Sequence, residues 1–178
     1  MAKIDDDHMY YGAALLQIAE HPQYTSINTY KRGEKPVRCC YVVNDEAGLY
    51  VKYRSKQQGA FRYKTTNGER PGNEYHFVFD RKSRNTIDEM VQQRPSLFLA
   101  LVCVEDRQIC CISYEEFRNL VDKRHELLGG QESAQVAIYV AKIENSGFQV
   151  FVPTPKKRGS MNATTRVPQN AFPKKVFT

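Results

Sequence analysis

The sequence of 178 residues contains no apolar run that could cross a membrane. A spanning helix needs about 20 consecutive apolar residues, whereas the strand-like run at residues 97–104 has eight. The amino-terminus carries Asp5, Asp6 and Asp7, where a secretory signal would carry basic residues. These absences predict a soluble, cytoplasmic protein that does not contact a membrane.

The chain also lacks the spacing of a cysteine metal site. Its five cysteines lie in apolar runs, with no C-x-x-C pair and no nearby pair of histidines: Cys39, Cys40, Cys103, Cys110 and Cys111. Such cysteines are typical of buried, reduced thiols, whereas zinc sites need closely spaced ligands. A glycine-rich phosphate loop is missing too, because Gly129-Gly130 stands alone. These patterns therefore assign no metal ion and no cofactor.

The clearest structural signal is a strand–strand–helix unit. Apolar runs at 97–104 and 109–112 surround a four-residue polar break, which predicts an antiparallel hairpin. The first run does not alternate, so we expect both of its faces to be covered. Ser113 and Glu116 then have the spacing of a capping box, which predicts that a helix begins there.

The other elements extend this unit to a mixed central sheet flanked by helices. In chain order we predict a helix over 9–20, strands over 37–43, 49–53 and 75–79, a helix from Asn85 or Thr86 to Arg94, the hairpin with its helix, and strands over 135–143 and 148–152. The order α-β-β-β-α-β-β-α-β-β is typical of an α/β or α+β fold. We expect an amino-terminal tail over 1–8 and one globular domain over 9–152. Residues 153–178 cannot form a core of their own, so this basic tail is disordered or packed on the surface.

Positive charge is concentrated in two stretches. Residues 52–84 contain nine Lys or Arg against three Asp or Glu, and residues 151–178 contain six against none. Separated basic stretches indicate an anionic partner such as DNA or RNA. A solvated surface with a flexible tail is the alternative.

The first basic stretch predicts a phosphate-binding face. If 49–55 and 60–65 pair as a hairpin, Arg54 lies opposite Arg62 and Lys52 lies opposite Lys64. Period-two alternation puts these four cations on one face beside Tyr50. Like charges directly opposite each other are destabilising, so a polyanion would relieve the repulsion and the tyrosine could stack on a base. In another register, or in a solvated loop, the cations would not converge.

The second basic stretch begins with Lys156, Lys157 and Arg158. With no acidic residue in the stretch to compete, these side chains could follow a phosphate backbone. They could equally dock on the acidic surface of residues 85–150, or only increase solubility.

A catalytic hypothesis comes from Asp80-Arg81-Lys82, which has D-x-K spacing, and from Asp45 after an earlier strand. With the element order of residues 9–104, these motifs resemble the PD-(D/E)xK nuclease-like superfamily. The resemblance implies that Asp45 and Asp80 hold Mg²⁺ and that Lys82 orients the attacking water. The sequence departs from the family because no Pro precedes Asp45 and Tyr50 stands where an acid is expected beside Lys52. An active nuclease, a degenerate relative and a simple helix cap at Asp80 all remain open.

We therefore predict a nucleic-acid-binding domain with a degenerate nuclease-like fold. A metal-dependent nuclease is the first alternative. The second is a subunit that binds a protein partner and no nucleic acid. The sequence does not distinguish DNA from RNA.

Overall fold

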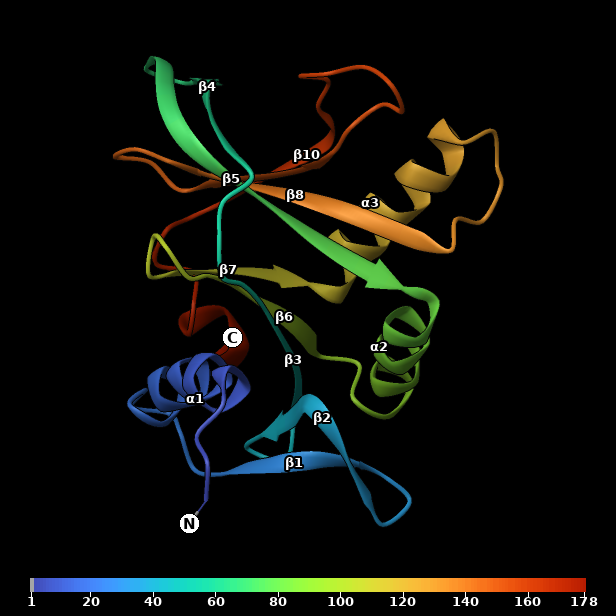
Figure 1. Cartoon of the computed structure of the whole chain (residues 1–178). Coiled ribbons are helices and arrows are strands. Elements are labelled where there is room, and N and C mark those ends of the chain that lie inside the picture. Colours follow the sequence, from blue (N-terminus) through green and yellow to red (C-terminus); the bar gives the residue numbers. More distant parts are fainter. Residues whose placement is uncertain (1) are drawn as a thin grey trace.

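The computed structural model describes residues 2–178, in which the strands form two five-stranded sheets (Figure 1). Sheet A has the order β1 (Ile27–Arg32), β2 (Lys35–Val43), β3 (Ala47–Arg54), β6 (Leu97–Cys103), β7 (Gln108–Ser113). Sheet B has the order β10 (Asn162–Val167), β9 (Phe148–Val152), β8 (Gln135–Ile143), β5 (Gly68–Asp80), β4 (Gly59–Thr65). The mixed α+β character is confirmed, but the prediction of one central sheet is wrong.

Three α-helices and a short 3-10 helix complete the described part of the chain. They are α1 (Asp6–Ala19), α2 (Arg81–Gln93), α3 (Tyr114–Leu127) and η1 (Lys174–Phe177). Helix α1 begins three residues before its predicted start because Asp5 caps it, accepting a hydrogen bond from the backbone N–H of His8. Within residues 2–178, none of the helices has the length and apolar character needed to span a membrane.

The predicted strand–strand–helix unit is confirmed. Strands β6 and β7 pair antiparallel, and β6 also pairs parallel with β3. Side chains of β6 are buried on both faces of sheet A, with Leu99 and Leu101 on one and Ala100 and Val102 on the other. The capping box of Ser113 and Glu116 starts α3 as expected.

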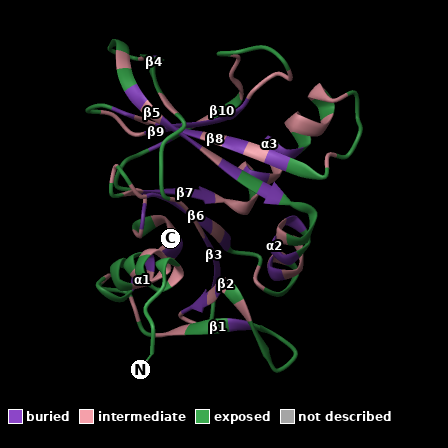
Figure 2. Cartoon of the chain, viewed as in Figure 1, coloured by how far each residue is buried: buried purple, intermediate pink, exposed green. Residues whose placement is uncertain are grey.

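Two hydrophobic cores hold the layers together. The inner strands of both sheets are largely buried, whereas the edge strands β1, β4 and β10 are largely exposed (Figure 2). The main core lies between the sheets and includes apolar residues of α2 and α3. The second core covers the opposite face of sheet A with α1 and the carboxy-terminal segment. Sheet A is thus covered on both faces, whereas the second face of sheet B has only a small cluster of its own.

Two polar strands at sheet edges were not predicted. Strand β1 lies in a stretch without apolar alternation, and β10 lies in the predicted tail. Each pairs with a neighbouring strand, β2 or β9, so backbone hydrogen bonds hold segments that could not form a core alone. Beyond β10, Phe172 and Val176 are buried in the second core.

Sheet B curls, and its second face is concave. The amide of Gln149 on β9 donates a hydrogen bond to the carbonyl of Lys64 on β4, with an N···O distance of 2.8 Å. In a flat sheet these strands would be about 14 Å apart, because β8 and β5 lie between them. The ring of Tyr63 packs over Gly72, where an added Cβ would lie 2.9 Å from that ring and from the carbonyl oxygen of Lys142. Glycine at this position therefore permits the curl.

We predict that Phe172→Ala lowers the free energy of unfolding by about 3 kcal/mol, because it leaves a cavity in the second core. Phe61→Ala is the matched control, since Phe61 is 52% exposed and its truncation should cost less than about 0.5 kcal/mol. Urea denaturation followed by circular dichroism measures both values. Equal losses in the two variants would show that the carboxy-terminal segment does not stabilise the domain.

Candidate nucleic-acid interface

The predicted basic hairpin does not form, because its two strands lie in different sheets. Strand β3 pairs with β2 and β6, while β4 pairs with β5 through a two-residue loop between Thr65 and Gly68. A loop this short makes β4–β5 the more local pairing. Lys52 and Arg54 therefore lie on sheet A, and Arg62 and Lys64 lie on sheet B.

The expected role of Tyr50 in base stacking is wrong, because this side chain is buried. Its ring lies 6.2 Å from that of Phe79 inside the main core. Lys52 is half-buried beside it, with its ammonium 5.3 Å from the centre of the Phe79 ring. Burial lowers the pKa of Lys52, and the nearby carboxylate of Asp80 partly opposes this shift. Lys52 thus interacts mainly with groups at the edge of the core.

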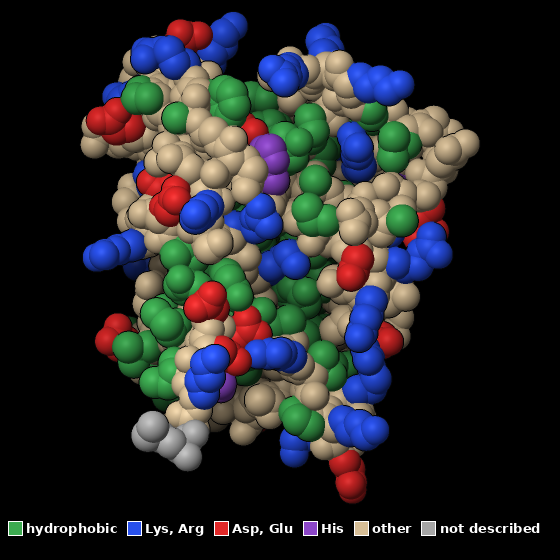
Figure 3. All heavy atoms as spheres, in the orientation of Figure 1, with side chains coloured by type: hydrophobic (Ala, Val, Ile, Leu, Met, Phe, Trp, Pro, Cys, Tyr) green, Lys and Arg blue, Asp and Glu red, His purple; other side chains and the backbone are tan. Residues whose placement is uncertain are grey.

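The other three predicted cations of this stretch differ in their partners. The buried Nε of Arg54 has no hydrogen-bond partner in residues 2–178. Arg62 is exposed and lies 3.7 Å from the carboxylate of Glu69, and Lys64 is exposed. The chain between Arg54 and Arg62 passes from sheet A to sheet B on the side turned to the viewer in Figure 1. Lys and Arg side chains lie across the middle and along the upper edge of this side (Figure 3).

The second predicted set lies at the other side of sheet B. Lys156, Lys157 and Arg158 belong to the loop between β9 and β10, and all three are exposed. None of them has an acidic partner within 4.0 Å in the described part of the chain. Strands β4 and β10 are the two edges of sheet B. Tyr63 faces the concave side, so its neighbours Arg62 and Lys64 point to the other face of β4, and only the β9–β10 loop remains as a predicted basic set beside the concave face.

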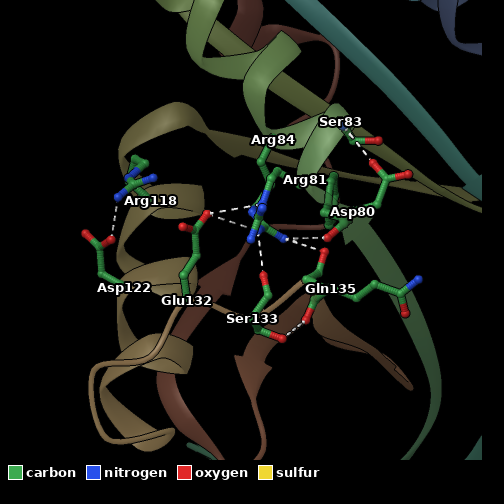
Figure 4. A network of polar contacts seen from close by, with 11 residues as sticks. Asp80, Arg81, Ser83, Arg84, Arg118, Asp122, Glu132, Ser133 and Gln135 are labelled. Atoms are coloured by element: carbon green, nitrogen blue, oxygen red, sulfur yellow. Dashed lines mark hydrogen bonds and ion pairs between the residues drawn. The ribbon is translucent and has the colours of Figure 1, made fainter.

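The proposed catalytic Asp80 caps a helix. Its carboxylate accepts a hydrogen bond of 2.7 Å from the backbone N–H of Ser83 in the first turn of α2 (Figure 4). The same contact lowers the pKa of Asp80. Next to it, the buried Arg84 donates hydrogen bonds to the carbonyls of Phe79 and Ser133. This network attaches the start of α2 to the segment that leads into β8.

Asp45 lies far from Asp80. It occupies the turn between β2 and β3, where its carboxylate accepts a 3.4 Å hydrogen bond from Asn28. This turn is at the carboxy-terminal end of α2, since a Cβ added at Gly48 would lie 3.5 Å from the Cβ of Arg94. Asp80 caps the other end of the helix, which is about 20 Å long. Asp45, Asp80 and the exposed Lys82 therefore cannot surround one Mg²⁺ ion.

A polar cluster that the sequence reading did not single out lies on the concave face. The side chain of Glu74 is largely buried, and one of its oxygens accepts a 2.5 Å hydrogen bond from the Tyr63 hydroxyl. Its other oxygen is 2.8 Å from Nε2 of His76. Burial and the neighbouring carboxylate raise the pKa of Tyr63, so its hydroxyl remains a proton donor in this bond.

Aromatic rings hold His76 in place. The imidazole stacks on the ring of Tyr139, with 3.6 Å between ring centres and 7° between ring planes, and Tyr139 contacts Phe151 edge-on. The three residues are register neighbours on β5, β8 and β9. In addition, Gln58 accepts a hydrogen bond from the backbone N–H of His76. The signal available in the sequence was the two-residue spacing of Glu74 and His76, which puts both on one face of a strand.

One nitrogen of His76 remains accessible. Its Nδ1 makes no hydrogen bond within residues 2–178, and this atom is not fully buried. It therefore reaches solvent on the concave face.

Comparison of the chain with protein-family models, with curated proteins and with solved structures finds no match in any of the three. The resemblance to the PD-(D/E)xK superfamily thus stays a prediction.

We predict that Asp80→Ala lowers the free energy of unfolding by about 1 kcal/mol at neutral pH, because α2 loses its cap. Asp80→Ser should cost much less, since a serine hydroxyl also accepts the hydrogen bond, and Lys82→Ala is the control for an exposed neighbour. The folded pKa of Asp80 is lowered, so its contribution is present at neutral pH and is lost as the pH falls through that value. Urea titrations of all three variants at several pH values test the cap. If serine destabilises as much as alanine, the helix-cap explanation is contradicted.

Proposed function

We propose that this protein binds single-stranded nucleic acid along the concave face of sheet B. The observation that carries the proposal is the basic β9–β10 loop, whose Lys156, Lys157 and Arg158 are exposed and have no ion-pair partner within residues 2–178. This loop lies beside a curled sheet face whose Glu74 is buried and hydrogen-bonded.

Electrostatics support a polyanionic ligand. The pairing of β10 with β9 holds the loop with Lys156, Lys157 and Arg158 beside the sheet. Folding therefore already orders this segment before any ligand binds. The three cations lack ion-pair partners within residues 2–178, and phosphate groups would supply them. Lys64 and Arg62 provide positive charge at the opposite edge, where Glu69 is the nearby acid. Release of counterions from the ligand would then drive binding.

The aromatic floor favours a single strand. The stacked rings of His76 and Tyr139 are half-buried, so part of their surface remains accessible to solvent. Unpaired bases can stack on such side chains, whereas the bases of a duplex are already stacked on each other. Arg54 and Lys56 add positive charge where the chain crosses from sheet A to sheet B.

The charge-reversal variant Lys156→Glu/Lys157→Glu tests the proposal. We expect it to weaken binding of a fluorescent 20-nucleotide single strand at least tenfold, and to reduce the slope of log affinity against log salt by about 0.7 for each lost phosphate contact. Fluorescence anisotropy over a series of salt concentrations, with RNA, single-stranded DNA and duplex DNA, gives both quantities.

The matched control is Lys31→Glu/Lys35→Glu. These lysines are exposed on the β1–β2 hairpin of sheet A, and their reversal changes net charge by the same amount. Equal losses in the two variants would mean that only total charge matters and would contradict a site on sheet B. Absence of salt-sensitive binding to any strand would overturn the proposal and favour a protein partner.

A further inference from the structure

We propose that the concave face also cleaves RNA, with His76 as the general base. This inference rests on the proposed nucleic-acid binding and adds a reaction to it. The geometry that carries it is the contact between Glu74 and His76, together with the accessible Nδ1 of the imidazole.

Glu74 determines which nitrogen of His76 can take up a proton. An ionised carboxylate only accepts hydrogen bonds, so Nε2 at 2.8 Å from Glu74 carries the hydrogen. In the neutral ring Nδ1 then has the free lone pair, and this nitrogen reaches solvent. A buried carboxylate that orients a histidine in this way is a recurrent arrangement for general-base catalysis.

Burying a charged group is costly unless it is fully hydrogen-bonded, so Tyr63 and His76 both satisfy the Glu74 carboxylate. Of these two partners, His76 has the ring that can take up a proton near neutral pH, and 27% of its side chain is exposed. The stack on Tyr139 restrains the His76 ring further, and the hydrogen bond from the His76 backbone N–H to Gln58 fixes the main chain beside it. Such restraint is what positioned catalysis requires.

RNA provides the nucleophile for this base. Nδ1 of His76 takes the proton of a ribose 2′-hydroxyl, and the 2′-oxygen forms a bond to the adjacent phosphorus. The bond from phosphorus to the 5′-oxygen of the next nucleotide breaks, and the proton passes from the imidazolium to that oxygen. The products are a 2′,3′-cyclic phosphate and a 5′-hydroxyl. Atoms and charge balance without another reactant, and DNA lacks the attacking group.

The test uses purified protein, EDTA and a 20-nucleotide single-stranded RNA, with mass spectrometry of the product ends. We expect cyclic-phosphate and 5′-hydroxyl ends, and no cleavage when the strand is 2′-deoxy. His76→Phe keeps a ring against Tyr139 and should lower the rate about a hundredfold or more. His21→Phe is the matched control, because His21 also stacks on an aromatic ring, that of Phe177, but lies away from sheet B.

Glu74 is a positioning residue and needs a different readout. In Glu74→Gln the amide can donate to Nε2, which leaves the hydrogen on Nδ1 and removes the base. We expect a lower kcat with an unchanged KM, whereas a structural role would also alter binding. In His76→Ala, added imidazole should partly restore cleavage.

RNA that is bound but remains intact would overturn the cleavage and leave the proposed binding in place. Equal cleavage by His76→Phe and wild type would also overturn it, by assigning the activity elsewhere. If RNA is neither bound nor cut, both proposals fail.

Discussion

Tyr75, Phe77 and Phe79 are fully buried between the two sheets, and their burial fixes the register of β5. Because side chains alternate along a strand, the same register turns Glu74 and His76 to the concave face. A shift of one residue would exchange these sets and place a carboxylate and an imidazole in the core. The main hydrophobic core thus determines where the polar cluster lies.

The two-sheet arrangement also separates the basic stretches in space. The chain leaves sheet A after Arg54 and enters sheet B, so cations adjacent in sequence are divided between layers. The carboxy-terminal segment then adds β10 at the far edge of sheet B and brings Lys156, Lys157 and Arg158 to the opposite flank. Charge from both stretches is therefore distributed around one curled sheet, although the hairpin predicted to gather it does not exist.

Local signals predicted much of the fold. Strands β8 and β9 have their predicted bounds, and the capping box of Ser113 is confirmed, because apolar alternation and caps depend on neighbouring residues. Edge strands β1 and β10 were missed because their stability comes from pairing with another strand. The prediction of one sheet failed for a related reason, since alternation shows which residues share a face but not which strand lies beside them.

The candidate site was less predictable than the fold. The D-x-K triplet at Asp80 indicated a metal centre, but a helix cap uses the same residue. The spacing of Glu74 and His76 was visible in the sequence, but Tyr63 lies on a strand that was predicted to pair with residues 49–55 rather than with β5. Tyr139 comes from β8, whose pairing with β5 is non-local. Tyr50 was expected at the surface, and the packing of sheet B against sheet A buries it. Such placements follow only from the assembled layers.

Backbone NMR chemical-shift mapping with a short single-stranded oligonucleotide tests the proposed nucleic-acid site on sheet B most directly. We expect the largest changes at His76, Tyr139 and residues 156–158, with little change at α1 or the β1–β2 hairpin. Changes confined to sheet A and α1, or no changes at low salt, would contradict it.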